Sequence, residues 1–204
     1  MESKSYDVVL LPEENLSDLA ISTSEDLAQY GTYFTLGRDK YFPHLSLYML
    51  QLSQEGLSRT LELLKEIANN TNLLNVEIKH YHYSHHYLDV EYIKTEALGD
   101  IQNVVLDSLN PIRSGLRKKD EARLKTAEGD ERTNILDFGY RSVGDMFAPH
   151  LTFTRFVENQ SEIISELPKI ESFNGSFNAL AIFEMGDHGT CAKEVARFDL
   201  RRTS

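Results

Sequence analysis

The 204-residue chain has one cysteine, Cys191, and no tryptophan. A single thiol cannot form a disulfide within the chain or a CxxC centre, so we expect a reducing, cytoplasmic location. Long apolar runs are also missing. The first such run, Val8 to Leu11, ends at Pro12 and is too short for a secretory signal. No window approaches the ~18 apolar residues that a membrane span needs, so no membrane is expected as a partner.

Positive charge is scarce as well. Asp and Glu number 32 against 21 Lys and Arg, and the net charge is -11. Proteins that coat long DNA or RNA bind largely by neutralising phosphates, so this composition argues against long nucleic acid as a partner. A small anionic ligand in a local pocket is compatible with it. The chain also lacks the GxSxG, GxxxxGKS/T, GxGxxG and HExxH patterns, which leaves serine hydrolases, P-loop enzymes, Rossmann proteins and zincins without support.

What the chain does have is apolar residues at regular strand and helix spacings. Strands are predicted over residues 6–11, 44–50, 74–78, 88–92, 147–156, 177–185 and 193–200. Apolar stripes of helices span residues 16–27, 57–68 and 98–109, and a further helix is expected around 161–167. Ser53 and Thr95 are the predicted N-caps of the second and third of these helices. Residues 74–78 and 88–92 are expected to pair as a hairpin, residues 33–36 to form a short strand, and residues 111–145 a short helix with loops. The fold class is therefore α+β.

One internal repeat stands out. Residues 43–47 read PHLSL and residues 149–153 read PHLTF. Because side chains alternate along a strand, His44 shares a face with Ser46, and His150 shares one with Thr152. Each copy would bury its apolar residues and present an imidazole with a hydroxyl.

Two such strands facing one cleft would form an acid–base site. Histidine has an ordinary pKa of ~6.5, so one imidazole can accept a proton while the other donates one. The two hydroxyls can bind an oxyanion between them, which suits attack on phosphorus. The alternative is two histidines at strand ends with satisfied hydrogen bonds and no catalytic role.

These motifs resemble the two-histidine (2H) phosphoesterase superfamily, also called the 2′-5′ RNA ligase-like or LigT-like family. Its signature is a pair of H-h-S/T-h motifs, where h is hydrophobic; here they are HLSL at His44 and HLTF at His150. Many members carry an Arg shortly after the second motif, and Arg155 in PHLTFTR matches it. Ser46 stands where Thr is commoner. On a regular strand Arg155 would point away from His150, and only a bulge or a strand end would bring it back.

The resemblance implies a single two-lobed domain over residues 1–204, with two antiparallel sheets forming a central cleft and helices outside. It implies a metal-independent phosphodiesterase that acts on a cyclic-phosphate nucleotide or a short 2′-5′-linked or cyclic oligonucleotide, without a cofactor and as a monomer. By position, His44 and His150 are the acid and base, in an order left open, while Ser46, Thr152 and Arg155 hold the phosphate. The alternatives are a non-catalytic nucleotide-binding module of the same fold and 2′-5′ RNA ligase activity.

Three other groups of residues were candidates. Tyr48 shares strand parity with His44 and is predicted to stack on a base. The stretch HYHYSHH, His80 to His86, favours solvent-facing or hydrogen-bonded histidines over a zinc-dependent hydrolase, because no third ligand is placed beside it. The basic residues from Arg113 to Arg123, Arg117 among them, are interpreted as a solvated face rather than phosphate ligands.

Overall fold

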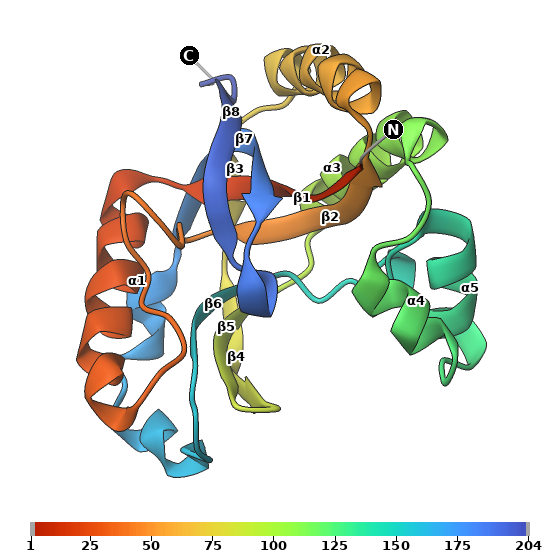
Figure 1. The fold of residues 1–204 in the computed structure, drawn as a ribbon. Coiled ribbons are helices and arrows are strands. Elements are labelled where there is room, and N and C mark those ends of the chain that lie inside the picture. Colours follow the sequence, from red (N-terminus) through yellow and green to blue (C-terminus); the bar gives the residue numbers. More distant parts are fainter. Residues whose placement is uncertain (1–2, 203–204) are drawn as a thin grey trace.

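The structure is a computed structural model that describes residues 3–202. Two antiparallel sheets lie at its centre with helices around them (Figure 1), as the α+β prediction requires. The first sheet has the strand order β2-β1-β7-β3, and β8 also pairs with β7; the second has the order β4-β5-β6. Over residues 3–202, no helix is long and apolar enough to cross a membrane.

The two sheets draw on different parts of the chain. The first takes strands from both ends: β1 (Lys4–Pro12), β2 (Leu45–Leu52), β3 (Leu74–Val76), β7 (Gly175–Met185) and β8 (Cys191–Asp199). The second takes strands from the middle: β4 (Ile78–Ser84), β5 (Tyr87–Tyr92) and β6 (His150–Arg155). The helices are α1 (Glu14–Leu27), α2 (Gln54–Asn70), α3 (Glu96–Leu109), α4 (Lys118–Leu124) and α5 (Gly129–Phe138).

The helices begin where the sequence predicts, and α1 does not cover the sheet that contains the strand before it. The hydroxyls of Ser53 and Thr95 accept hydrogen bonds from the first turns of α2 and α3, which confirms both N-caps. These two helices pack on strands of the first sheet. In contrast, α1 follows β1 in sequence yet packs against β6 of the second sheet. This arrangement leaves the opposite faces of the two sheets free to face each other.

The motif strands are the edges where the sheets meet. β2 is the outermost strand of the first sheet and β6 of the second, and the two contact each other. The PHLS and PHLT segments therefore converge, although they lie far apart in the sequence. This is the arrangement that the repeat predicts.

A single-residue bulge follows the hydroxyl residue in each motif. In β2, Ser46 pairs with Val9 and Tyr48 with Val8, which leaves Leu47 without a partner on β1. In β6, Phe153 is left unpaired in the same way, between Thr152 and Thr154. A bulge inserts one residue and reverses which face the following residues occupy. Each motif therefore ends in a change of strand parity.

Buried side chains satisfy the carbonyl groups of both bulged residues. The amide of Gln102 on α3 donates to the Leu47 carbonyl at 3.0 Å and to the Ser142 carbonyl at 2.8 Å. The hydroxyl of Ser24 on α1 donates to the Phe153 carbonyl at 2.8 Å. A buried carbonyl without a donor is costly, so these two contacts stabilise the bulges.

Four local expectations were wrong. The segment predicted as strand 74–78 is divided at Glu77: β3 pairs with β7, and β4 pairs with β5 across the predicted turn. Residues 33–36 form no strand, since only Thr32 makes an isolated bridge. Residues 161–166 form 3₁₀ turns rather than an α-helix. Residues 111–145 hold two helices, α4 and α5, instead of one.

Removing either donor should destabilise the fold. Ser24→Ala and Gln102→Leu each leave buried backbone carbonyls unpaired, so we expect a loss of ~1–3 kcal/mol per orphaned group. Urea unfolding monitored by circular dichroism measures the difference. Ser58→Ala is the matched control, because the Ser58 hydroxyl bonds its own helix in an exposed position. Equal midpoints for all three variants and the wild type would contradict this account of the bulges.

Candidate active site

The two motif histidines are held in the same way. The Nδ1–H of His44 donates to the carbonyl of Phe42 at 2.7 Å, and that of His150 to the carbonyl of Ala148 at 2.8 Å. In each case the acceptor lies two residues earlier, just before the proline. A carbonyl oxygen only accepts, so the Nδ1 of each ring carries the proton and Nε2 is free for chemistry.

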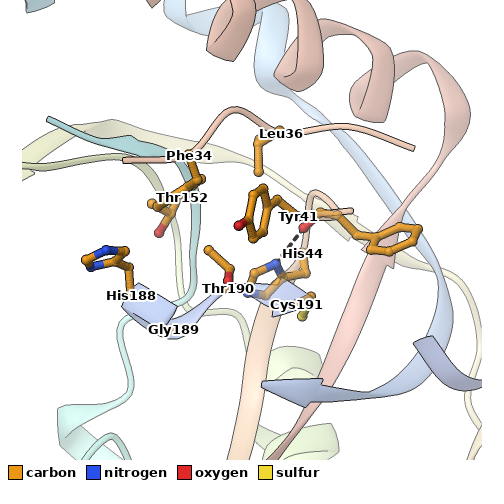
Figure 2. A pocket seen from close by; sticks show the side chains of 10 residues that line it. Phe34, Leu36, Tyr41, His44, Thr152, His188, Gly189, Thr190 and Cys191 are labelled. Carbon is orange, nitrogen blue, oxygen red and sulfur yellow. Dashed lines mark hydrogen bonds between the residues drawn. The ribbon is translucent and has the colours of Figure 1, made fainter. Parts of the chain in front are cut away.

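A pocket joins the two motifs. His44 from the first motif and Thr152 from the second line the same pocket, together with Tyr41 and residues of the β7–β8 turn. Figure 2 shows Thr152 and His188 on one side, His44 and Cys191 on the other, and Thr190 between them. Ser46 and His150 are not part of this wall.

A buried carboxylate lies behind His44. Asp7 on β1 is fully buried, and its Oδ2 accepts a 2.7 Å hydrogen bond from the Ser46 hydroxyl. The same oxygen lies 3.9 Å from Nε2 of His44, whose side chain is 11% exposed. The other oxygen, Oδ1, is buried without a hydrogen-bond partner. The predicted phosphate ligand Ser46 therefore contacts Asp7 in this structure.

Burial changes the pKa values of Asp7 and His44 in opposite directions. Loss of hydration raises the pKa of Asp7 to about 7, while the Ser46 hydrogen bond and the positive charge of Arg117 act in the opposite direction. Loss of hydration likewise lowers the pKa of His44 to about 4; the Phe42 hydrogen bond opposes this, and the charge of His150 adds to it. At neutral pH, His44 is therefore an uncharged imidazole with a free Nε2.

The bulge in β6 places Arg155 on the same face as Thr152. Arg155 pairs with Tyr87 on β5 and Thr152 pairs with Asp89, two residues further along the same strand. The guanidinium lies between the rings of Tyr33 and Tyr87 and donates from Nη1 to Nδ1 of His188 at 2.8 Å. Its Nε is buried without a partner. Arg155 thus borders the pocket through His188, despite its unfavourable parity on a regular strand.

The same geometry removes Tyr48 from consideration. The bulge at Leu47 turns Tyr48 to the opposite face from Ser46, where it is fully buried and donates to the Phe138 carbonyl at 2.6 Å. A ring in this position has no free face for a base, so the predicted stacking role does not fit. Tyr41, in contrast, lines the pocket.

The remaining candidates fall in three places. His80 and His82 lie on the cleft face of the second sheet, because they pair across β5 with the rows of His150 and Thr152. His80 lies 3.6 Å from Glu91, and His82 lies 3.4 Å from Asp89. His85 is at the exposed hairpin turn. Arg117 is not a solvated charge as expected: it is buried and donates to Asp120 at 2.6 Å.

Sequence reasoning missed three residues of this region. Asp7 is the one charged residue within the buried part of β1, residues 6–12, and that contrast was the available signal. His188 and Thr190 belong to the turn between β7 and β8. This turn reaches the pocket only because of the way the strands of the first sheet pair. Nothing in their local sequence distinguishes them from ordinary turn residues.

Comparison with known proteins agrees with this architecture. No protein-family model and no curated protein sequence matches the chain. Solved structures do match: E. coli LigT in its apo form superposes with a TM-score of 0.59 at 12% identity, over 98% of this chain and 99% of LigT. The chain has the LigT fold. TT0787 of Thermus thermophilus gives a TM-score of 0.60 at 14% identity, covering 98% and 100% of the two chains. A structure described as a phosphoesterase gives 0.52 at 15%, covering 98% and 99%.

The two copies of the repeat occupy equivalent places in this fold, which is why they indicate the fold although the sequence identity to LigT is only 12%. Both motifs lie on the edge strands where the two sheets meet, so each must supply the same backbone turn before its histidine. The resemblance that the sequence suggested is thereby confirmed for the fold.

The buried acid makes stability depend on pH in a defined direction. Between about pH 4 and 7, the unfolded carboxyl of Asp7 has lost its proton while the folded one keeps it, so rising pH disfavours the folded state. Asp7→Asn removes this effect. As pH rises across that window, the free energy of unfolding of the variant should increase relative to that of the wild type by up to about 4 kcal/mol. The difference should not change further at higher pH.

Urea denaturation at several pH values measures this difference. Asp145→Asn is the control, since Asp145 is exposed. The lowered pKa of His44 acts with the opposite sign, because falling pH between about 6.5 and 4 favours the unfolded state. Subtracting wild type from D7N cancels that contribution to first order. A difference that stays constant with pH would rule out a raised pKa for Asp7.

Proposed function

We propose that the protein is a metal-independent phosphodiesterase that acts on a cyclic-phosphate nucleotide or a short 2′-5′-linked or cyclic oligonucleotide. The observation that supports this most directly is the matched pair of histidines. Both have Nδ1–H tied to a backbone carbonyl, and both come from the edge strands that meet between the sheets. Such a pair can accept a proton on one side of a phosphorus atom and donate one on the other.

The environments of the two histidines suggest which role each takes. Burial keeps the pKa of His44 low, so its Nε2 is unprotonated at neutral pH and can accept a proton from the attacking water or hydroxyl. Proton donation to the leaving oxygen then falls to His150, whose ring hydrogen bond is exposed while that of His44 is partly buried. The repulsion between them disfavours the state in which both are charged.

The phosphate would be held from the second sheet. Thr152 offers a hydroxyl in the pocket wall, and Arg155 is the permanent positive charge beside it. The rings of Tyr33 and Tyr87 and the hydrogen bond to His188 orient the guanidinium, and its Nε is left without a partner in the structure. Charge-assisted hydrogen bonds of this kind are the strong ones in phosphate recognition.

The class of substrate follows from the pocket and the charge. E. coli LigT, which shares the fold, has been solved with phosphate, ATP, NADP+ and 3′-AMP. Aromatic residues Phe34 and Tyr41 line the pocket here and could contact a base. The net charge of -11 opposes a long polyanion, so a nucleotide or short oligonucleotide is the favoured substrate.

The decisive experiment is a panel of 2′,3′-cyclic nucleotides and 2′-5′ oligoadenylates, assayed with and without excess EDTA, with product identification. We expect turnover that persists under chelation. His44→Ala and His150→Ala should each reduce turnover by ~10²–10⁴-fold, as expected for loss of a general base or acid. His85→Asn, at the exposed hairpin turn, is the matched control and should keep wild-type rates.

Each other outcome points elsewhere. Binding without turnover would indicate a nucleotide-binding module, and joining of 2′-5′ ends would indicate a ligase. Activity lost on chelation would contradict the metal-free mechanism.

Arg155 should act on substrate affinity more than on chemistry. Arg155→Met removes the charge beside Thr152, so we expect KM to rise on the order of 10- to 100-fold, the value of one charge-assisted hydrogen bond, with a smaller change in kcat. Arg155→Lys should restore part of the affinity. Arg59→Met on the exposed face of α2 controls for loss of a positive charge. An unchanged KM for Arg155→Met would exclude a phosphate-binding role.

A further inference from the structure

Three potential metal ligands gather at the base of the pocket. A carboxylate oxygen of Asp7, a ring nitrogen of His44 and the sulfur of Cys191 all lie within 4.8 Å of one another. The Asp7 Oδ2 to His44 Nε2 distance is 3.9 Å. Zinc with tetrahedral bonds of about 2.0–2.3 Å places its ligand atoms roughly 3.3–3.6 Å apart. Movements of about an ångström would therefore bring all three onto one ion.

The surrounding hydrogen bonds are those that metal ligands have in proteins. A ligating histidine normally donates its second ring nitrogen to a carbonyl or carboxylate, and a ligating carboxylate is itself hydrogen-bonded. Here His44 donates from Nδ1 to the Phe42 carbonyl, which leaves Nε2 directed at the cluster. The Ser46 hydroxyl holds Asp7 at 2.7 Å. Two of the three ligands are therefore already oriented.

The cluster also has an unsatisfied polar atom. Oδ1 of Asp7 is buried without a hydrogen-bond partner, although the nearby Arg117 could in principle have neutralised it. Arg117 donates instead to Asp120. A bound cation would give the Asp7 carboxylate the partner that the protein does not supply.

The ligand chemistry and the access route select the ion. A thiolate and an imidazole favour zinc over magnesium or calcium, which prefer oxygen ligands alone. His44 and Cys191 both line the pocket; Cys191 is fully buried, but the His44 side chain is partly exposed, so an ion can enter along His44. Three protein ligands leave the fourth zinc position facing that pocket, where a water can bind.

We propose that Asp7, His44 and Cys191 form an inhibitory zinc site. Coordination uses the Nε2 lone pair of His44 and displaces the Cys191 thiol proton and, below about pH 7, the Asp7 carboxyl proton, and both pass to the solvent. The inhibitory part rests on the proposed function, since it requires that His44 act as the base. Zinc binding itself does not depend on that function, so the two can be tested separately.

The binding test uses Co²⁺ as a spectroscopic probe for the zinc site. Full-length protein, stripped with chelator and then freed of it, is titrated with Co²⁺. We expect one ion per chain and a thiolate-to-cobalt charge-transfer band, which Zn²⁺ then displaces. Because Cys191 is the single cysteine, the band reports this site alone. Cys191→Ser should abolish the band and weaken zinc binding at least tenfold.

A matched variant separates this site from the other histidines. His80→Ala combined with His82→Ala removes the exposed histidines of β4 and should leave the band and the stoichiometry unchanged. Absence of the band in folded wild type, or equal zinc affinity in Cys191→Ser, would overturn the proposal.

The activity test is carried out after the binding test, because its result can be interpreted only once zinc binding has been measured. With a substrate identified, zinc should inhibit the wild type, and EDTA should reverse the inhibition. The ratio of rates with and without zinc should move toward one in Cys191→Ser. An inactive protein with an intact cobalt band would contradict the proposed function alone, whereas an active protein without the band would contradict the zinc site alone.

Discussion

The geometry of the site depends on two backbone carbonyls that accept hydrogen bonds from helix side chains, at residues left out of the strand pairing. Leu47 and Phe153 each stand outside the pairing of their strand, and each is retained because a helix supplies a buried donor, Gln102 in one case and Ser24 in the other. Without the bulge, a strand would continue its alternation and carry the next side chain into the cleft. With it, the imidazole and hydroxyl stay on the cleft side while the residue directly after the bulge, Tyr48 or Thr154, turns into the core.

The bulges also explain why Tyr48 is absent from the cleft and Arg155 is present in it. Tyr48 and Arg155 follow their bulges by one and two residues, so Tyr48 enters the core and Arg155 emerges on the cleft face. The same local device thus removes an aromatic ring from one wall and adds a cation to the other. The two walls are alike in their motifs and different in charge, which suits a ligand with one anionic end.

The apolar spacings were enough to predict the α+β class, and the repeat was enough to predict that its two strands converge. Short local signals also fixed the N-caps at Ser53 and Thr95, because capping depends only on nearby atoms. The bulges could not be predicted, since the donors that stabilise them come from distant helices. Asp7 was overlooked for a related reason. Its partner Ser46 comes from another strand. Only the pairing of β1 with β2 places the Ser46 hydroxyl beside this single acidic residue of an apolar segment.

One residue separates the sheets along the chain: β3 ends at Val76 and β4 begins at Ile78. The first sheet also needs both ends of the chain, since β1 pairs with β7, and α1 leaves that sheet to cover the second. The halves are therefore interlocked rather than joined by a linker. The first sheet cannot be assembled from a continuous stretch of sequence, and the second, whose strands are consecutive, still needs α1 from the N-terminal part of the chain to cover it. We therefore expect folding to be cooperative and slowed by the distant pairings that must close before the first sheet is complete.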